Sequence, residues 1–180
     1  MRRLGLTFAL LAVAAASPLS AQVRTTSLGI SGGLSMPTGD ALDAAEMGYN
    51  ITGSLYIRPA RFANLGFRGD IAWDKFSVEN SDGSTIRSLG FVFNGQYSLP
   101  VGSSVTPYLL AGIGWYSTEV IAVAGSVERK GSDSNLGYDV GAGLAFNLSG
   151  FSTFLEARYV NIMADPNSYS FAPITFGIRF

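Results

Sequence analysis

The chain has 180 residues, of which 12 are Lys or Arg and 13 are Asp or Glu, and it contains neither histidine nor cysteine. A formal charge of −1 without a basic cluster excludes a nucleic-acid-binding surface. The absence of cysteine excludes disulfides, and the absence of both residue types removes the commonest nitrogen and sulfur ligands of metal sites. The sequence therefore predicts neither a metal nor a cofactor.

The N-terminal segment, residues 1–21, has the three parts of a secretory signal peptide. Arg2 and Arg3 form a basic start, an apolar run follows from Leu4 to Ala16, and small residues occupy the exit. The alternative is a helical membrane anchor, which needs about 20 apolar residues, more than this run provides. We predict cleavage after residue 21, which leaves one domain over residues 22–180 and, with both arginines removed, changes the formal charge from −1 to −3.

Eight segments of this domain read as strands, because apolar residues alternate with small or polar ones. They are Thr26–Met36, Tyr49–Arg58, Leu65–Phe76, Arg87–Leu99, Pro107–Thr118, Leu136–Leu148, Phe151–Asn161 and Ser170–Phe180. The segment Pro107–Thr118 is apolar on both faces, so its phase stays open. No later stretch reaches 18 consecutive apolar residues, and strands cross a membrane only as a closed barrel. The predicted fold is all-β, an eight-stranded antiparallel up-and-down transmembrane β-barrel.

The connections between these strands alternate in length. Residues 59–64, 100–105 and 149–150 form short turns, whereas residues 37–48, 77–86, 119–135 and 162–169 form longer polar connections. In membrane barrels short turns face the periplasm and long loops face the outside. We therefore expect both termini in the periplasm.

The composition of the two faces distinguishes a membrane barrel from a soluble one. The polar face is rich in Gly, Ser and Asn, and only 14% of the chain is charged. A water-facing exterior would carry more charge, as in soluble container barrels. The apolar face carries aromatic residues near strand ends, where lipid headgroups favour them: Tyr49, Trp73, Tyr97, Tyr138, Tyr159 and Phe180. We expect the apolar face to contact lipid.

Eight charged residues share the predicted interior. They are Arg58, Arg68, Asp70, Asp74, Asp139, Glu156, Arg158 and Arg179, four acids and four bases. Buried charges must be paired to be tolerated, and eight strands leave an interior that side chains fill. We predict a balanced charge network that plugs the lumen. The alternative is a gated path for protons or ions.

Three of the long connections carry further candidates. Asp40, Asp43 and Glu46 share one side of a helical turn and either form a solvated loop or contact divalent cations at a lipopolysaccharide surface. Glu79 and Asp82 are a weaker pair in the second long connection. In the third, an apolar strip at 121–124 precedes charges at 128–130, so strands five and six either simply continue or present a contact edge.

Three stretches give the chain a family resemblance. Pro107–Gly114, Leu136–Leu144 and the ending Phe176-Gly177-Ile178-Arg179-Phe180 resemble the small eight-stranded outer-membrane barrels of the OmpA, OmpX and opacity-protein kind. The resemblance covers residues 22–180 and implies a Gram-negative outer membrane, contact with its lipids and lipopolysaccharide, and recognition by the barrel assembly machinery through Phe176, Ile178 and Phe180. The peptidoglycan-binding domain that follows the barrel in OmpA is not expected, since the sequence ends at Phe180.

The chemistry of the residues favours a role without catalysis. A serine nucleophile needs a base, and no histidine is available. The sequence predicts a protein with a structural or adhesion-like surface-contact role, which it performs through its extracellular loops. The ligand of these loops cannot be identified from the sequence. The alternatives are a narrow transport barrel for small hydrophobic or ionic solutes, and a lipid-modifying enzyme that works without histidine.

Overall fold

A computed structural model describes residues 25–39, 42, 45–62, 64–79, 81, 83–101, 104–124, 127–165 and 167–180. The signal peptide predicted for residues 1–21 lies outside them. The described chain forms eight strands: β1 (Thr26–Thr38), β2 (Gly48–Ile57), β3 (Leu65–Ser77), β4 (Thr85–Ser98), β5 (Val105–Ala124), β6 (Val127–Asn147), β7 (Ser152–Ile162) and β8 (Tyr169–Arg179). In the described residues, no helix is long and apolar enough to span a membrane.

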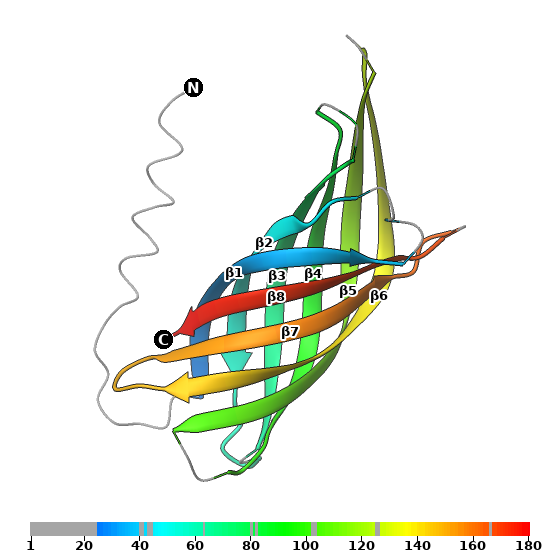
Figure 1. The fold of residues 1–180 in the computed structure, drawn as a ribbon. Helices are drawn as coiled ribbons and strands as arrows, with labels where there is room; N and C mark the ends of the chain where they lie inside the picture. Colours follow the sequence, from blue (N-terminus) through cyan, green and yellow to red (C-terminus); the bar gives the residue numbers. More distant parts are fainter. Residues whose placement is uncertain are drawn as a thin grey trace, which may run out of the picture.

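The strands close into a single barrel in sequence order (Figure 1). Each strand pairs antiparallel with its neighbours in the chain, and β1 pairs with β8, where Ile30 faces Ile178. Closure removes the unpaired sheet edges that would otherwise be exposed. The predicted fold class, an eight-stranded antiparallel up-and-down barrel, is confirmed.

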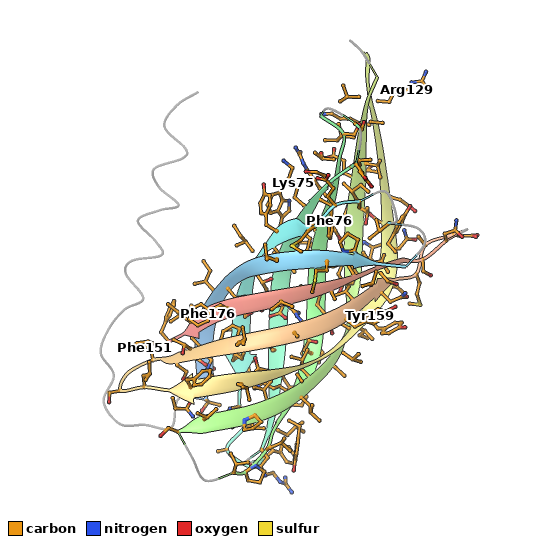
Figure 2. All side chains as sticks on the ribbon, viewed as in Figure 1. Lys75, Phe76, Arg129, Phe151, Tyr159 and Phe176 are labelled. Carbon is orange, nitrogen blue, oxygen red and sulfur yellow. The ribbon has the colours of Figure 1, made fainter. Side chains whose placement is uncertain are left out.

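The two faces of the strands have the polarity of a membrane barrel. Large apolar side chains point outward and are exposed, with Ile113 the extreme at 71% exposure, while Asn94 on the inner face is 0% exposed. Outward aromatic residues occur along the wall, and Figure 2 shows Phe151 and Phe176 toward the end that holds the C-terminus. This is the reverse of a soluble protein and matches a wall that contacts lipid.

The barrel has two different ends. We call the end that carries the start of β1 and the finish of β8 the terminal end, and its connections are residues 58–64, 99–104 and 148–151. The opposite, long-loop end has connections at residues 39–47, 78–84, 125–126 and 163–168.

One connection differs from its expected length. Residues 119–135 were predicted as a polar loop, but β5 continues to Ala124 and β6 begins at Val127, so only two residues connect them. Strands five and six therefore continue through residues 119–124 and 127–135, as both alternatives for this segment require. The β5–β6 hairpin extends well past the rest of the barrel (Figure 1).

The interior is packed with aromatic and aliphatic side chains at two levels. An apolar cap at the long-loop end consists of Leu42, Phe76, Val92, Tyr116, Val160, Ile162 and Phe171. Leu42, which belongs to the first connection, packs into this cap. A smaller cluster near the terminal end consists of Tyr108, Leu110, Ala145 and Phe154. The polar interior lies between these two levels.

The phase of β5, which the sequence left open, is set by its even-numbered residues. Tyr108 and Tyr116 point inward and are buried, whereas Ile113 and Trp115 point outward. Tyr108 needs space on the neighbouring strand, and Gly143, its partner in the β5–β6 register, provides it. A Cβ atom at Gly143 would overlap the Tyr108 ring, so only glycine fits there.

Candidate functional site

The candidate site is a cluster of charged side chains inside the barrel, which we call the lumen network: Arg68, Asp70, Asp139, Glu156 and Arg158. Residues two apart on a strand point to the same face. Arg68 and Asp70 of β3 therefore point inward together, and so do Glu156 and Arg158 of β7. Asp139 comes from β6, which pairs with β7. Every member is buried among the described residues.

Arg68 connects two carboxylates through its guanidinium group. Its Nη1 and Nη2 donate to the two carboxylate oxygens of Glu156 at 2.7 and 3.0 Å. Its Nε donates to Asp70 Oδ2 at 3.0 Å. The residue is only 2% exposed. A planar fork with five donors suits this geometry better than an ammonium group would.

Arg158 contacts the same two acids as Arg68 and also Asp139. Its Nη1 donates to Asp70 Oδ2 at 3.2 Å and to Asp139 Oδ2 at 3.1 Å. Its Nε lies 3.1 Å from Glu156 Oε1, within ion-pair distance. The two arginines therefore share Asp70 and Glu156, and the network connects β3, β6 and β7 across the barrel.

Asp74 lies closer to the long-loop end than the network does. Its carboxylate accepts a hydrogen bond from Ser35 Oγ, and Ser35 Oγ accepts one from Asn50 Nδ2 at 2.9 Å. No Arg or Lys nitrogen of the described chain lies within 4.0 Å of it. Asp74 is thus held by the neutral hydroxyl of Ser35, which the Asn50 amide supports, and by no cation of the described chain.

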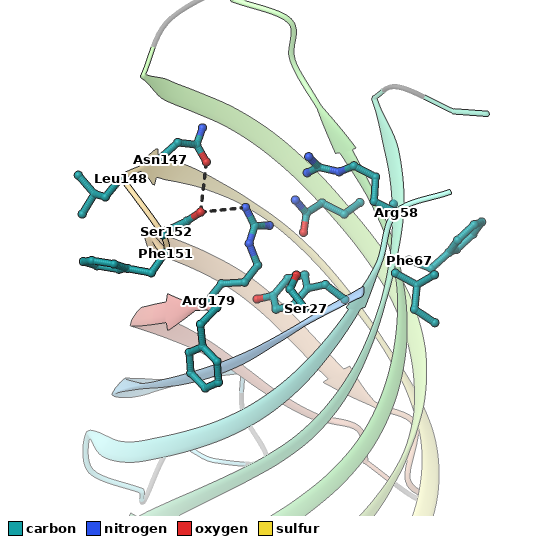
Figure 3. Close-up of a pocket in the computed structure, with 14 residues that line it drawn as sticks. Ser27, Arg58, Phe67, Asn147, Leu148, Phe151, Ser152 and Arg179 are labelled. Carbon is teal, nitrogen blue, oxygen red and sulfur yellow. Dashed lines mark hydrogen bonds between the residues drawn. The ribbon is translucent and has the colours of Figure 1, made fainter. Parts of the chain in front are cut away.

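The last two predicted members, Arg58 and Arg179, lie apart from the lumen network. Arg58 follows the last residue of β2, and Arg179 is the last residue of β8, so both side chains reach the terminal mouth of the barrel. Figure 3 shows them on either side of a cavity there. Instead of four acids balanced by four bases, the interior formed by the described residues buries two arginines and four acids.

The sequence did not indicate several neutral residues that complete the lumen network. Tyr108 donates to Glu156 Oε2 at 2.7 Å. Ser54 donates to Asp70 Oδ1 at 2.6 Å, and Asn94 donates to Asp70 Oδ2 at 3.1 Å. Ser54 and Asn94 do stand on predicted inner faces, but Tyr108 had no signal because the phase of its strand was open.

The acids of the long connections do not form a metal site in the described structure. No group of three or more potential metal ligands occurs among the described residues. Asp40, Asp43 and Asp82 lie outside them, while Glu46 is exposed and its backbone nitrogen donates to Ser77 O. The divalent-cation alternative therefore gains no support from the placed residues.

The β5–β6 hairpin exposes a strand edge at the long-loop end. In the described sheet β6 pairs with β7 only from Gly137 onward, and Leu136 O also accepts a hydrogen bond from Met163 N, so residues 131–135 of β6 pair with β5 alone. The β4 side is better covered, because β4 pairs with β5 as far as Ile121 and Val123 N donates to Ser84 Oγ at 2.9 Å. The hairpin therefore has one covered edge and one open edge.

The residues of the proposed assembly signal lie on the outer face of β8. Phe176, Ile178 and Phe180 point away from the lumen and are exposed, at the terminal end of the barrel. Phe180 exchanges two backbone hydrogen bonds with Leu28. The C-terminal aromatic residue is thus fixed at the seam where β8 meets β1.

These features define a class, the membrane-spanning β-barrel with an apolar exterior and a filled polar lumen. The sequence matches the family described as outer membrane protein beta-barrel domain over residues 6–180, and the chain belongs to that family. The family places it in a Gram-negative outer membrane. Comparison with curated protein sequences finds no significant match.

Solved structures share the fold at low sequence identity. Neisserial surface protein A has a TM-score of 0.68 at 14% identity, with 86% of this chain and 96% of that chain covered. The attachment invasion locus protein Ail of Yersinia pestis has a TM-score of 0.53 at 18% identity, with 86% and 97% covered. The outer membrane enzyme PagL has a TM-score of 0.54 at 20% identity, with 86% and 98% covered.

Proposed function

We propose that this chain is a closed outer-membrane barrel that acts at the cell surface through its long-loop end, in a structural or adhesion-like role, with both termini in the periplasm. The observation that carries the proposal is the β5–β6 hairpin, which projects past the other strands and leaves the edge of β6 at residues 131–135 without a second strand in the described sheet. An open strand edge can accept a strand from a partner.

The packing of the lumen supports contact over transport. The lumen network crosses the interior, and the apolar cap lies between it and the long-loop end. Within the cap, Phe76 and Phe171 meet edge to face with ring centroids 5.4 Å apart. A solute path through the barrel would have to disrupt both levels.

The charge of the long-loop end limits which partners suit it. Its connections and hairpin, residues 39–47, 78–84, 119–135 and 163–168, contain nine Asp or Glu and two basic residues. Lys75 and Arg87 at nearby strand ends add two more positive charges. One solved structure of Ail holds the heparin analogue sucrose octasulfate. A polyanion of that kind suits this acidic end poorly, so we infer a neutral or basic partner.

The same composition supports a role without catalysis. PagL shows that this fold can carry an enzyme, but the present sequence contains no histidine to activate a serine. We infer that the chain does not modify lipids. Mass spectra of lipid A from cells with and without the gene should be identical, and a mass change that depends on the gene would establish the enzymatic alternative.

The outer surface supports two further partners. Exposed aromatic residues near strand ends, among them Tyr49, Tyr97 and Phe180, suit the headgroup regions of the outer-membrane lipids and of lipopolysaccharide. The outward aromatic ending of β8 resembles the signal that the barrel assembly machinery recognises, and we infer that Phe176, Ile178 and Phe180 serve this purpose.

Shortening the hairpin tests the surface-contact proposal. Ser117 and Ser134 face each other in the register, so replacing residues 118–133 by Asn-Gly rejoins the strands through a two-residue turn and removes most of the open edge. Cells that display this variant should lose adhesion to surfaces coated with basic protein, while the barrel still shows heat-modifiable migration on gels. The control exchanges residues 164–167 in the β7–β8 connection for Ser. Equal adhesion of wild-type and shortened proteins would contradict the proposal.

A further inference from the structure

The terminal mouth of the barrel contains a basic cavity that the proposed surface role does not use. Two adjoining cavities of about 280 Å³ each open there, and both are lined by Arg58, Gln96, Asn147 and Arg179. Figure 3 shows both guanidinium groups directed toward the cavity from opposite walls.

Neither arginine has an acidic partner. In the part of the chain that the structure describes, no carboxylate, including that of the C-terminus, lies within 4.0 Å of Arg58 or Arg179. The terminal connections, residues 58–64, 99–104 and 148–151, contain no Asp or Glu at all. The carboxylates deeper in the barrel, Asp70 and Glu156, are already engaged by the lumen network. Two unneutralised cations that face one cavity favour an anion between them.

Arg179 is fixed in place by neutral groups. Its Nη2 donates to Ser152 Oγ at 3.4 Å, and Ser152 in turn donates to Asn147 Oδ1 at 3.2 Å. Its guanidinium carbon lies 5.2 Å from the centroid of the Tyr56 ring. These contacts orient the group but do not neutralise it, so its remaining donors are available to a ligand.

Gln96 adds a buried polar group to the same wall. The residue is 6% exposed, and its Oε1 has no hydrogen-bond partner in the described structure. An amide can turn end for end and present its two N–H donors instead of its oxygen. A ligand that accepts several hydrogen bonds would satisfy this amide and both arginine forks at once.

We propose that this mouth binds a phosphate group, held by Arg58 and Arg179. Phosphate accepts paired hydrogen bonds from guanidinium forks and more of them than a carboxylate does. The source is either free phosphate or the headgroup of a phospholipid in the adjacent leaflet. Exposed apolar side chains on the outer rim of the cavity, Leu148, Phe151 and Phe180, would lie beside acyl chains in the second case.

The test uses the full barrel in a maltoside detergent, which contains no phosphate. Titration calorimetry measures the binding of inorganic phosphate, the free anion. Native mass spectrometry measures the binding of phosphatidylglycerol, which carries the phosphate headgroup. Diacylglycerol, a lipid without phosphate, is the control. In R58Q/R179Q we expect affinity at least about tenfold weaker, since two charge-assisted contacts are lost. In Arg61→Gln, an exposed arginine outside the cavity, it should be unchanged.

Each outcome of this experiment decides something. Loss in R58Q/R179Q of phosphate binding, lipid binding or both supports the site, and the arm that responds identifies the source. Arg58→Gln alone, at an exposed position beyond β2, covers the case in which the double variant does not fold. The site is overturned if the wild type binds neither probe, if the cavity variants bind as the wild type does, if R61Q weakens binding equally, or if an acidic peptide binds and phosphate does not.

Discussion

At the scale of single residues, the interior is organised around acceptors that serve several donors at once. The Glu156 carboxylate receives both terminal nitrogens of Arg68 and the hydroxyl of Tyr108. Asp70 receives two arginines, a serine and an amide. Because each carboxylate satisfies several buried donors, removal of one leaves more than one group without a partner.

Glu156→Ala should therefore destabilise the barrel strongly. The substitution leaves Arg68 with Asp70 as its remaining carboxylate and removes the acceptor of the Tyr108 hydroxyl. We expect a loss of about 3 to 5 kcal/mol in the free energy of unfolding, the range for breaking a buried ion pair. Urea unfolding in lipid vesicles, followed by tryptophan fluorescence, measures it. Arg58→Ala at the terminal mouth is the control, and a Glu156→Ala loss under about 1 kcal/mol would show a solvated, weakly coupled network.

At the scale of strands, the alternation of the sequence predicts most of the wall and less of the interior. Seven strands could be assigned two faces, because most of their inner residues are small or polar, although a few large apolar residues also point inward: Phe76, Val92, Phe154, Val160, Ile162 and Phe171. β5 could not, since its inner face carries Tyr108, Leu110 and Tyr116, which the sequence cannot distinguish from lipid-facing residues. Tyrosine suits both environments, because its ring is apolar and its hydroxyl can find a partner inside.

The ion pairs within the lumen could not be predicted from the sequence either. Which acid meets which arginine depends on the stagger between strands, and β3 is not a neighbour of β7 in the sheet. The Arg68–Glu156 pair crosses the interior, so no rule about adjacent strands predicts it. The sequence also could not show where the strands end. Arg58 and Arg179 follow the inner-face alternation, but they lie at strand ends and their side chains reach the terminal mouth.

The outer face of β4 provides a test of the lipid-facing assignment. Phe91 pairs with Ile71 and Trp115 on its neighbours and lies midway along its strand. Phe91→Arg should cost about 2 to 4 kcal/mol in the free energy of unfolding in lipid, as for arginine at the midplane of other barrels. Tyr97→Arg, near the terminal end of the same strand, should cost about 0 to 1 kcal/mol. Equal stabilities of the two variants would contradict the assignment.

Deletion of Phe180 tests the proposed role of β8 in assembly. The residue ends the outward aromatic series and is exposed beside β1. We expect export to remain normal and the yield of folded barrel to fall, because the assembly machinery would lose its terminal contact. Heat-modifiable migration of membrane fractions measures the yield. A deletion of Gly150, in a terminal turn, controls for general loss of one residue, and a normal yield without Phe180 would remove the proposed signal.

At the scale of the whole molecule, the two ends of the barrel differ in charge. The long-loop connections are acidic, whereas the terminal connections hold Arg58 and Arg61 without an acid. The same asymmetry separates the two proposals, since a contact role belongs to the acidic end and phosphate binding to the basic one. The filled lumen isolates the two ends, because the lumen network and the apolar cap occupy the space between them.

This isolation predicts that the purified protein does not conduct as a porin does. Eight strands enclose a space that side chains fill, and here an arginine–carboxylate network and an aromatic cap fill it in series. In planar bilayers we expect no large, steady openings. Glu156→Ala loosens the network but leaves the Phe76–Phe171 contact in place, so it should remain closed as well. A general porin serves as the positive control. Steady currents whose ion selectivity changes in Glu156→Ala would instead establish a transport barrel, and the surface-contact proposal would lose its closed lumen.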